Sequence, residues 1–189
     1  MNQINFATTN EYKIKFANSL LKKHNWECVP SKVTLIEPQS MTQAEISQYK
    51  VLQAYEQIHA PIITMDSGLF INCLKGMPGI YTADFFKALT NDQILRLLNG
   101  ESDRTAYIQQ TLSFADGIKI KSFSSKSEVT IVTPEVAVEG YAFDSFFKPN
   151  VTGKLMAQMT EDEKSLVWGE AWNELGNFLN QSIGGNVGN

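Results

Sequence analysis

The chain has 189 residues, of which 43% are hydrophobic and 19% are charged, a composition typical of a globular protein. Sixteen Lys and Arg against twenty Asp and Glu leave a net charge of −4, which argues against a general nucleic-acid-binding protein because such proteins carry a basic excess. The length predicts one domain, here residues 1–183, followed by a flexible tail over 184–189. With neither a signal-peptide pattern nor a long apolar run, we expect a cytoplasmic protein without a membrane partner.

The first half of the chain alternates between strand and helix patterns. Residues 3–8 are typical of a short buried strand, and a helical pattern follows directly after a polar cap region. Residues 32–36 predict a second strand and residues 42–59 a helix. The apolar run 61–65 predicts a central strand that ends at Asp66.

The second half adds a hairpin and a long helix. Residues 105–114 and 118–123 are strand-like and flank Asp116 and Gly117, a dipeptide that favours a hairpin turn. A capping-box pattern at Thr160 precedes a long helical stripe of apolar residues. Strands that alternate with helices and then give way to hairpins predict a mixed α/β sheet.

The junction between the first strand and the first helix, Thr8 to Lys13, is the first candidate site. A helix N-terminus presents free N–H groups and a partial positive charge, which suit a phosphate group. Lys13 adds a full charge one turn into the helix. The alternative is an ordinary helix cap with a solvated lysine, and the GxxxxGK spacing of a Walker loop is absent.

Three carboxylates form the second candidate site. Asp66 follows an apolar strand, where a buried carboxylate requires a partner or a metal ion. Glu37 and Glu45 lie near the end of an earlier strand and the start of the next helix, and the alternative for each is a solvated surface carboxylate. Cys28 and Cys73 lack the spacing of a soft-metal site. Any metal ion is therefore expected to be a hard cation such as Mg²⁺.

Aromatic residues beside a carboxylate form the third candidate. Tyr141 and Phe143 precede Asp144, so the rings could stack on a nucleotide base while Asp144 binds its edge. Packing of the rings in the core is the alternative.

Together these segments resemble the inosine triphosphate pyrophosphatase family, which hydrolyses non-standard purine nucleotides. The similar motifs occur in one order through nearly the whole chain. They are Thr8-Thr9-Asn10-Glu11-Tyr12-Lys13, the acidic stretch Glu37, Glu45 and Lys50, Met65-Asp66-Ser67-Gly68-Leu69, Gly76-Met77-Pro78-Gly79-Ile80-Tyr81, Tyr141-Ala142-Phe143-Asp144-Ser145, and Ala157-Gln158-Met159 with Glu163-Lys164.

The chain departs from the family pattern at several positions. Thr9 replaces the glycine of the phosphate loop, and Met65 replaces the first acid of an acidic pair. Trp168, Gly169 and Glu170 stand where the family has Ser-His-Arg, whose His and Arg bind a 6-oxo purine. Glu170 can only accept hydrogen bonds when ionised, whereas Arg donates them. Gly169 in mid-helix indicates a close approach by another group.

The resemblance implies an elongated mixed α/β sheet with flanking helices, whose two lobes lie around a central nucleotide cleft, usually in a homodimer. It implies that Mg²⁺, with Mn²⁺ possible, is held by Asp66 and by Glu37 or Glu45, and that water attacks the α-phosphorus. The products are then a nucleoside monophosphate and pyrophosphate. Asp66 and Lys50 are the implied catalytic residues, and the implied substrate-binding residues are Thr8, Thr9, Asn10, Lys13, Ser67, Tyr141, Phe143, Asp144, Lys164 and Glu170.

The sequence leaves two functions open. One is a nucleoside triphosphate pyrophosphatase whose base specificity differs from that for 6-oxo purines. The other is a nucleotide-binding protein that has lost turnover, as Met65 and the changes at 168–170 would permit. Retention of the carboxylates and lysines at the phosphate end favours the enzyme.

Overall fold

A computed structural model describes residues 1–38, 40, 42–133 and 144–182. The chain divides into two compact units. Unit 1 comprises Met1–Asp66, Gln110–Ser125 and the chain from Gly169 onward, and unit 2 comprises Ser67–Gln109 and Lys126–Trp168. The helices and strands in chain order are β1 (Asn2–Phe6), α1 (Glu11–Leu21), β2 (Trp26–Pro30), α2 (Gln43–Ile58), β3 (Ile62–Ile71), β4 (Pro78–Gly79), α3 (Thr82–Ala88), α4 (Asn91–Leu97), β5 (Thr105–Ala115), β6 (Ile120–Ile131), β7 (Phe147–Pro149) and α5 (Glu161–Ser182), with 3₁₀ turns at Lys22–His24 and Met156–Gln158.

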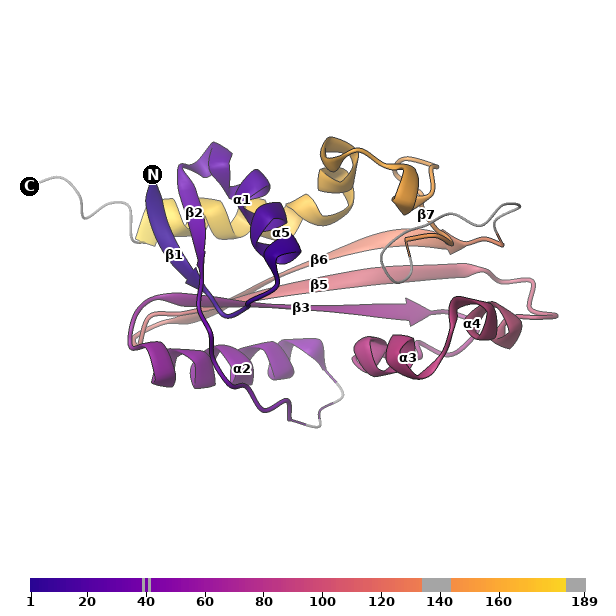
Figure 1. Ribbon diagram of the computed structural model, residues 1–189, viewed down its shortest axis with the longest axis horizontal. Helices are drawn as coiled ribbons and strands as arrows, with labels where there is room; N and C mark the ends of the chain where they lie inside the picture. Colours follow the sequence, from indigo (N-terminus) through magenta and orange to yellow (C-terminus); the bar gives the residue numbers. More distant parts are fainter. Residues whose placement is uncertain (39, 41, 134–143, 183–189) are drawn as a thin grey trace, which may run out of the picture. The chain divides into compact units, whose positions relative to one another are not determined.

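The strands of unit 1 follow the order β2-β1-β3-β5-β6. β1 pairs in parallel with both neighbours, so that Ile4 lies opposite Cys28 and Asn5 lies opposite Ile62. Ile4 and Phe6 of β1 are buried, and so is the first part of β3, because both faces of the sheet are covered here. Figure 1 shows α2 on one side of them and α1 with the C-terminal part of α5 on the other.

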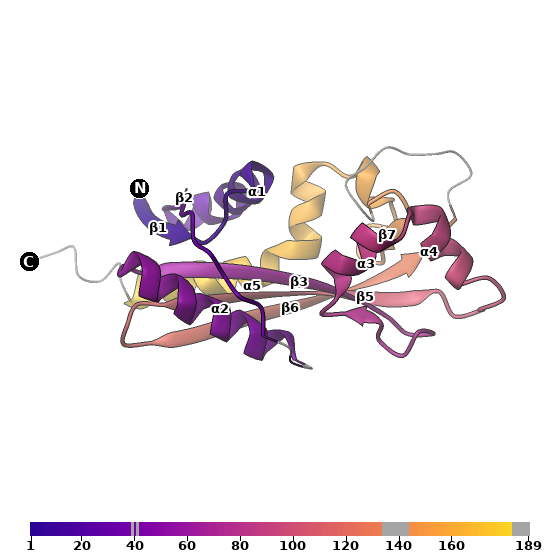
Figure 2. The ribbon, with the colours of Figure 1, turned by 60° about the horizontal axis from the view of Figure 1, so that its bottom comes forward.

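Side-chain contacts identify which helix covers which face of the unit 1 sheet. Thr64 of β3 donates a hydrogen bond to the carbonyl of Ser47 on α2, over a distance of 3.3 Å. On the other face, the Phe6 ring packs edge-to-face against Trp172 of α5, with ring centroids 5.9 Å apart. Figure 2 shows α2 lying along the sheet. Because strand side chains alternate between faces, Asp66 shares the α2 face with Thr64.

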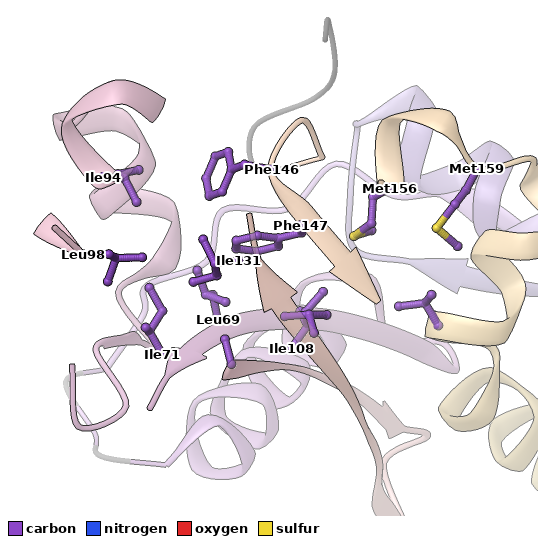
Figure 3. Close-up of a cluster of buried hydrophobic side chains, with 13 residues drawn as sticks. Leu69, Ile71, Ile94, Leu98, Ile108, Ile131, Phe146, Phe147, Met156 and Met159 are labelled. Atoms are coloured by element: carbon purple, nitrogen blue, oxygen red, sulfur yellow. The ribbon is translucent and has the colours of Figure 1, made fainter. Parts of the chain in front are cut away.

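Unit 2 has its own core, drawn in Figure 3. β3 continues into this unit and pairs with β4 in antiparallel fashion, and β6 pairs with β7 in the same way. α4 begins at a capping box formed by Thr90 and Gln93 and buries Ile94 in this core. The buried members of the core are Leu69, Ile71, Ile94, Leu98, Ala106, Ile108, Val129, Ile131, Phe146, Phe147, Met156, Met159 and Val167.

The structure confirms the mixed α/β class and most of the elements expected from the sequence. The hairpin turn forms at Asp116 and Gly117, and Thr160 caps α5 by accepting a hydrogen bond from the Glu163 amide at 3.2 Å. Asp66 does not end its strand, because β3 continues to Ile71. Residues 184–189 lie outside the described residues, and the single domain over 1–183 stays a prediction.

The prediction of a strand at residues 32–36 is wrong. The second strand is β2, and residues 32–36 are extended without a strand partner among the described residues. Their alternating pattern has another cause, since Val33 and Leu35 pack against a buried cluster that includes Val51. Within the described ranges, every helix is too short or too polar to span a bilayer.

Candidate functional site

The loop between β1 and α1 is arranged as a helix cap. The Asn10 side-chain oxygen accepts hydrogen bonds from the amides of Tyr12 and Lys13, at 3.0 and 3.2 Å. The Asn10 amide in turn donates to the Thr8 hydroxyl at 3.2 Å. Thr9 and Asn10 are exposed. Because Asn10 already occupies two of the free N–H groups of the helix, a phosphate group would be bound here mainly by side-chain donors and the helix dipole.

Lys50 joins two of the predicted carboxylates. Its Nζ lies 2.7 Å from Glu37 Oε1 and 2.5 Å from Asp66 Oδ1. The Lys50 side chain is 11% exposed and that of Asp66 15%, whereas that of Glu37 is 65% exposed. Burial acts to lower the pKa of Lys50, but the two carboxylates outweigh it and raise the pKa. Lys50 is therefore a charged lysine that orients both carboxylates.

Lys13 belongs to the same cluster. Burial lowers the pKa of Lys13, Asp66 and Glu37 act in the opposite direction, and the charge of Lys50 lowers it further. A buried ammonium group beside a second ammonium group gains from an additional anion. We call Lys13, Lys50, Glu37 and Asp66 the lysine–carboxylate group; all four lie in unit 1.

One oxygen of Asp66 is left for a ligand. Oδ1 accepts from Lys50, whereas Oδ2 is buried and has no hydrogen-bond partner among the described residues. A buried carboxylate oxygen without a partner is costly unless a cation, a water molecule or a ligand binds it. The residues therefore fit a divalent cation, because Mg²⁺ takes one or two carboxylates and completes its coordination with water and phosphate oxygens. No group of three metal-ligating side chains occurs in the described part of the chain.

Glu45 lies elsewhere. It occupies the first turn of α2, is exposed, and accepts a hydrogen bond from the Ser40 hydroxyl. That bond and one with Thr42 lower the pKa of the Glu45 carboxyl. Of the two glutamates predicted as alternatives, Glu37 is the one that shares Lys50 with Asp66.

Met65 has a partner that the sequence did not reveal. Its sulfur accepts a hydrogen bond from the Gln110 side-chain nitrogen at 3.5 Å, while Gln110 Oε1 is buried without a partner among the described residues. Gln110 is 3% exposed. In the sequence, Gln110 is one of several polar residues of β5, and nothing there indicates that it faces Met65.

Unit 2 holds a second pair of predicted residues. Asp144 is buried, and burial raises the pKa of its carboxyl while Lys164 acts to lower it and Glu161 to raise it. Lys164 is half-buried in the first turn of α5, and its Nζ lies 3.6 Å from Glu161 Oε1. The structure therefore brings Asp144 near Lys164. Ser67 follows Asp66 in β3 and is exposed, and Tyr141 and Phe143 lie outside the described residues.

Trp168, Gly169 and Glu170 lie on α5. Trp168 is half-buried and packs against the unit 2 core, as expected for an apolar stripe. Gly169 is buried, but a Cβ added there would meet Leu20 Cδ2 at 3.9 Å, an ordinary contact. The close approach expected at Gly169 is therefore absent from the described residues. Glu170 is exposed.

A unit that gathers Lys13, Lys50 and Glu37 around Asp66 of β3, with an exposed helix cap close by in sequence, is suited to a phosphorylated ligand and its cation. The sequence matches the Ham1 family over residues 4–175, and the chain belongs to this family. This membership confirms the family resemblance of the motifs.

Relatives and solved structures agree with this assignment. The chain is 31% identical over 180 residues to the dITP/XTP pyrophosphatase of Thermococcus kodakarensis, covering 94% of this chain and 97% of the relative. It is 34% identical to the dITP/XTP pyrophosphatase of Saccharolobus solfataricus over 168 residues, covering 86% and 85%. The fold matches the Ham1 protein of Coxiella burnetii with a TM-score of 0.82 at 23% identity, covering 96% of this chain and all of that chain.

Proposed function

We propose that this protein hydrolyses nucleoside triphosphates to nucleoside monophosphates and pyrophosphate with the help of a divalent cation. The observation that carries the proposal is the lysine–carboxylate group, in which Lys50 orients Asp66 and Glu37 while Asp66 Oδ2 is left for a ligand. Relatives named dITP/XTP pyrophosphatase, aligned along nearly the whole chain, support the same reaction.

The lysines and the carboxylates of the lysine–carboxylate group have different roles in this proposal. Lys13 and Lys50 would neutralise the phosphates, and Asp66 with Glu37 would hold Mg²⁺, or Mn²⁺ in its place. When bound, the cation supplies Lewis-acid polarisation of the phosphate oxygens. Asp66 also orients the attacking water and accepts its proton, so that hydroxide adds to the α-phosphorus and pyrophosphate leaves.

Product analysis tests the reaction. Incubation with a panel of nucleoside triphosphates and Mg²⁺ should yield monophosphate and pyrophosphate, separated by ion-exchange chromatography. Phosphate should then appear in a malachite-green assay only when inorganic pyrophosphatase is added. EDTA should stop the reaction, and Mn²⁺ should restore it. A diphosphate with directly released phosphate would contradict the proposal.

A nucleotide-binding protein without turnover is the second candidate. Met65 removes one carboxylate of the family pattern, and the Gln110 side chain binds its sulfur instead. Isothermal titration calorimetry with Mg²⁺ and nucleoside triphosphates distinguishes the two functions. Micromolar binding without any product after overnight incubation would establish this candidate and exclude the enzyme.

We further propose that the base preference differs from that of the relatives named for dITP and XTP. Glu170 is an exposed carboxylate at the position of the family's arginine. An ionised carboxylate accepts hydrogen bonds and therefore complements a base with an amino group rather than a lone carbonyl oxygen. The resemblance assigns Phe143 to stacking on the base and Asp144 to binding its edge.

The substrate ranking tests the base preference. We expect a guanine, adenine or cytosine nucleotide to have a kcat/KM at least equal to those of inosine and xanthosine triphosphates. We also expect Glu170→Ala to change the ranking, with the neighbouring exposed Glu174→Ala as a control that does not. A tenfold preference for inosine and xanthosine triphosphates, or an unchanged ranking in Glu170→Ala, contradicts this proposal.

The resemblance also supports a homodimer. Light scattering after size exclusion should then give twice the 21.2 kDa mass of one chain. A mass of one chain at micromolar concentration would contradict it.

A further inference from the structure

Two glutamines of α2 hold the extended segment that carries Glu37. Gln53 accepts a hydrogen bond from the Ile36 amide at 3.0 Å and donates one to the Ile36 carbonyl at 2.7 Å. Gln57 binds Thr34 in the same two ways, at 3.0 and 2.9 Å. Each side-chain amide thus replaces a neighbouring strand, because it satisfies both backbone groups of one residue. We call these four hydrogen bonds the glutamine ladder.

The spacing of the ladder matches the geometry of its two elements. Residues four apart on a helix are separated by about 6 Å along the axis. Residues two apart in an extended chain are separated by about 6.6 Å. Gln53 and Gln57 therefore fall in register with Ile36 and Thr34. The next position toward the N-terminus of α2 on this face is Lys50, whose Nζ binds Glu37.

Glu37 depends on such support because burial does not hold it. Its side chain is 65% exposed, and it is held by Lys50, which it shares with Asp66. A carboxylate on an exposed segment loses conformational entropy when it binds a cation, unless the backbone is already fixed. Gln53 fixes the residue directly before Glu37.

We propose that Gln53 is a positioning residue for the metal ligand Glu37, an inference that rests on the cation role given to Glu37 in the proposed function. Gln53 does not touch the cation or the substrate in this proposal. It acts by holding the backbone at Ile36 so that the Glu37 carboxylate stays beside Lys50 and Asp66. Gln57 acts one step further away, on Thr34, and its effect on the cation is correspondingly smaller.

Binding of Mn²⁺ alone, measured from the EPR signal of the free ion, tests this role without turnover. Gln53→Met keeps the length of the side chain and removes both hydrogen bonds to Ile36. We expect it to weaken Mn²⁺ binding at least fivefold. Gln57→Met is the matched control, because it removes the same two kinds of bond from Thr34, and we expect a change within twofold.

A double-mutant cycle separates positioning from general destabilisation. In the Glu37→Gln background, Gln53→Met should change Mn²⁺ affinity by less than twofold, because the ligand it positions is gone. Urea unfolding of all variants checks that Gln53→Met and Gln57→Met lose similar stability. A loss of Mn²⁺ affinity that persists in Glu37→Gln, or an equal loss in both Met variants, would overturn the inference.

The same measurements distinguish this inference from the proposed function. If the wild type binds Mn²⁺ and the cycle behaves as expected while no nucleotide is hydrolysed, the proposed reaction fails and the role of Gln53 stands. If the wild type hydrolyses nucleotides and Gln53→Met binds Mn²⁺ as tightly as wild type does, the role of Gln53 fails alone. A wild-type protein that binds no Mn²⁺ overturns the role of Gln53.

Discussion

The two carboxylate oxygens of Asp66 have different surroundings. Oδ1 accepts from Lys50, and Oδ2 is buried without a partner among the described residues. Asp66→Asn keeps the size of the side chain but removes the charge that holds a cation and accepts a proton. We expect Mg²⁺-dependent hydrolysis below a tenth of the wild-type rate, with the fold retained by circular dichroism.

Asp84→Asn is the matched control for this change. Asp84 is an exposed carboxylate on α3 whose Lys87 partner lies at 3.5 Å, so the substitution should leave the rate unchanged. An Asp66→Asn variant that keeps a tenth or more of the wild-type rate would remove Asp66 from the mechanism.

Lys13 makes the pH dependence of the reaction testable. Burial lowers the pKa of Lys13, so the protonated form that attracts phosphate is lost as the pH rises through this lowered pKa. The value of kcat/KM, which reports the free enzyme, should therefore fall on the alkaline side. Lys13→Arg stays charged and should move this fall to higher pH.

The pH profile of Lys13→Arg is compared with that of an exposed lysine variant on the same helix. Lys15→Arg should reproduce the wild-type profile because Lys15 is exposed and outside the lysine–carboxylate group. If the kcat/KM of Lys13→Arg falls at the same alkaline pH as that of wild type, a group other than Lys13 controls this fall.

At the scale of elements, the junction of β1 and α1 combines a cap with a candidate ligand. Asn10 caps α1 through its side-chain oxygen, and its amide nitrogen could donate to phosphate. Asn10→Asp keeps a good cap and adds a negative charge. We expect unchanged stability with at least tenfold weaker nucleotide binding by calorimetry, whereas Asn10→Ala should also lose about 1 kcal/mol of stability.

The cap of α2 provides the control for Asn10. Thr42 accepts a hydrogen bond from the Glu45 amide at 3.4 Å. Thr42→Ala should therefore reduce the free energy of unfolding by a similar amount and leave nucleotide affinity intact. Equal nucleotide affinity in wild type and Asn10→Asp would show that Asn10 is a cap only.

Local patterns predicted the elements whose partners are close in sequence. Helix caps at Asn10 and Thr160 and the hairpin turn at Asp116 depend on neighbouring residues, and the structure confirms them. Residues 32–36 have the alternation of a strand, but their backbone partners are Gln53 and Gln57. Periodicity reports which side chains are buried, and it does not report what the backbone binds.

The candidate site was predictable only in part, because its residues are far apart in the sequence. Family motifs indicated Asp66, Lys50 and Lys13, which the structure brings together, but the distance along the chain did not show which of Glu37 and Glu45 lies beside them. That difference depends on how the segment before Glu37 lies against α2, where the glutamine ladder binds Thr34 and Ile36. Similarly, the bond between Met65 and Gln110 joins residues 45 positions apart and has no local signal.

At the scale of the whole molecule, three strands and one helix each contribute residues to both units. β3 leaves unit 1 after Asp66, and α5 enters it at Gly169. β5 and β6 are divided in the same way, after Gln109 and after Ser125. Neither unit is a continuous segment, so unfolding of one unit breaks strands and a helix that the other shares. We therefore expect one cooperative unfolding transition.

A thiol in unit 1 can report a change made in unit 2. Cys28 is 2% exposed, and burial raises the pKa of its thiol to about 12, so it reacts with a disulfide reagent only after opening. Leu98 is fully buried in the core of unit 2, and Leu98→Ala should lower the free energy of unfolding by about 2–5 kcal/mol.

The measurement is made in a Cys73→Ser background, where Cys28 is the only thiol. There, Leu98→Ala should lower the urea midpoint of Cys28 labelling as much as it lowers the midpoint measured by circular dichroism. Leu175→Ala, a change in unit 1, is the control and must lower both urea midpoints. A Cys28 midpoint that Leu98→Ala leaves in place would show that the two units unfold separately.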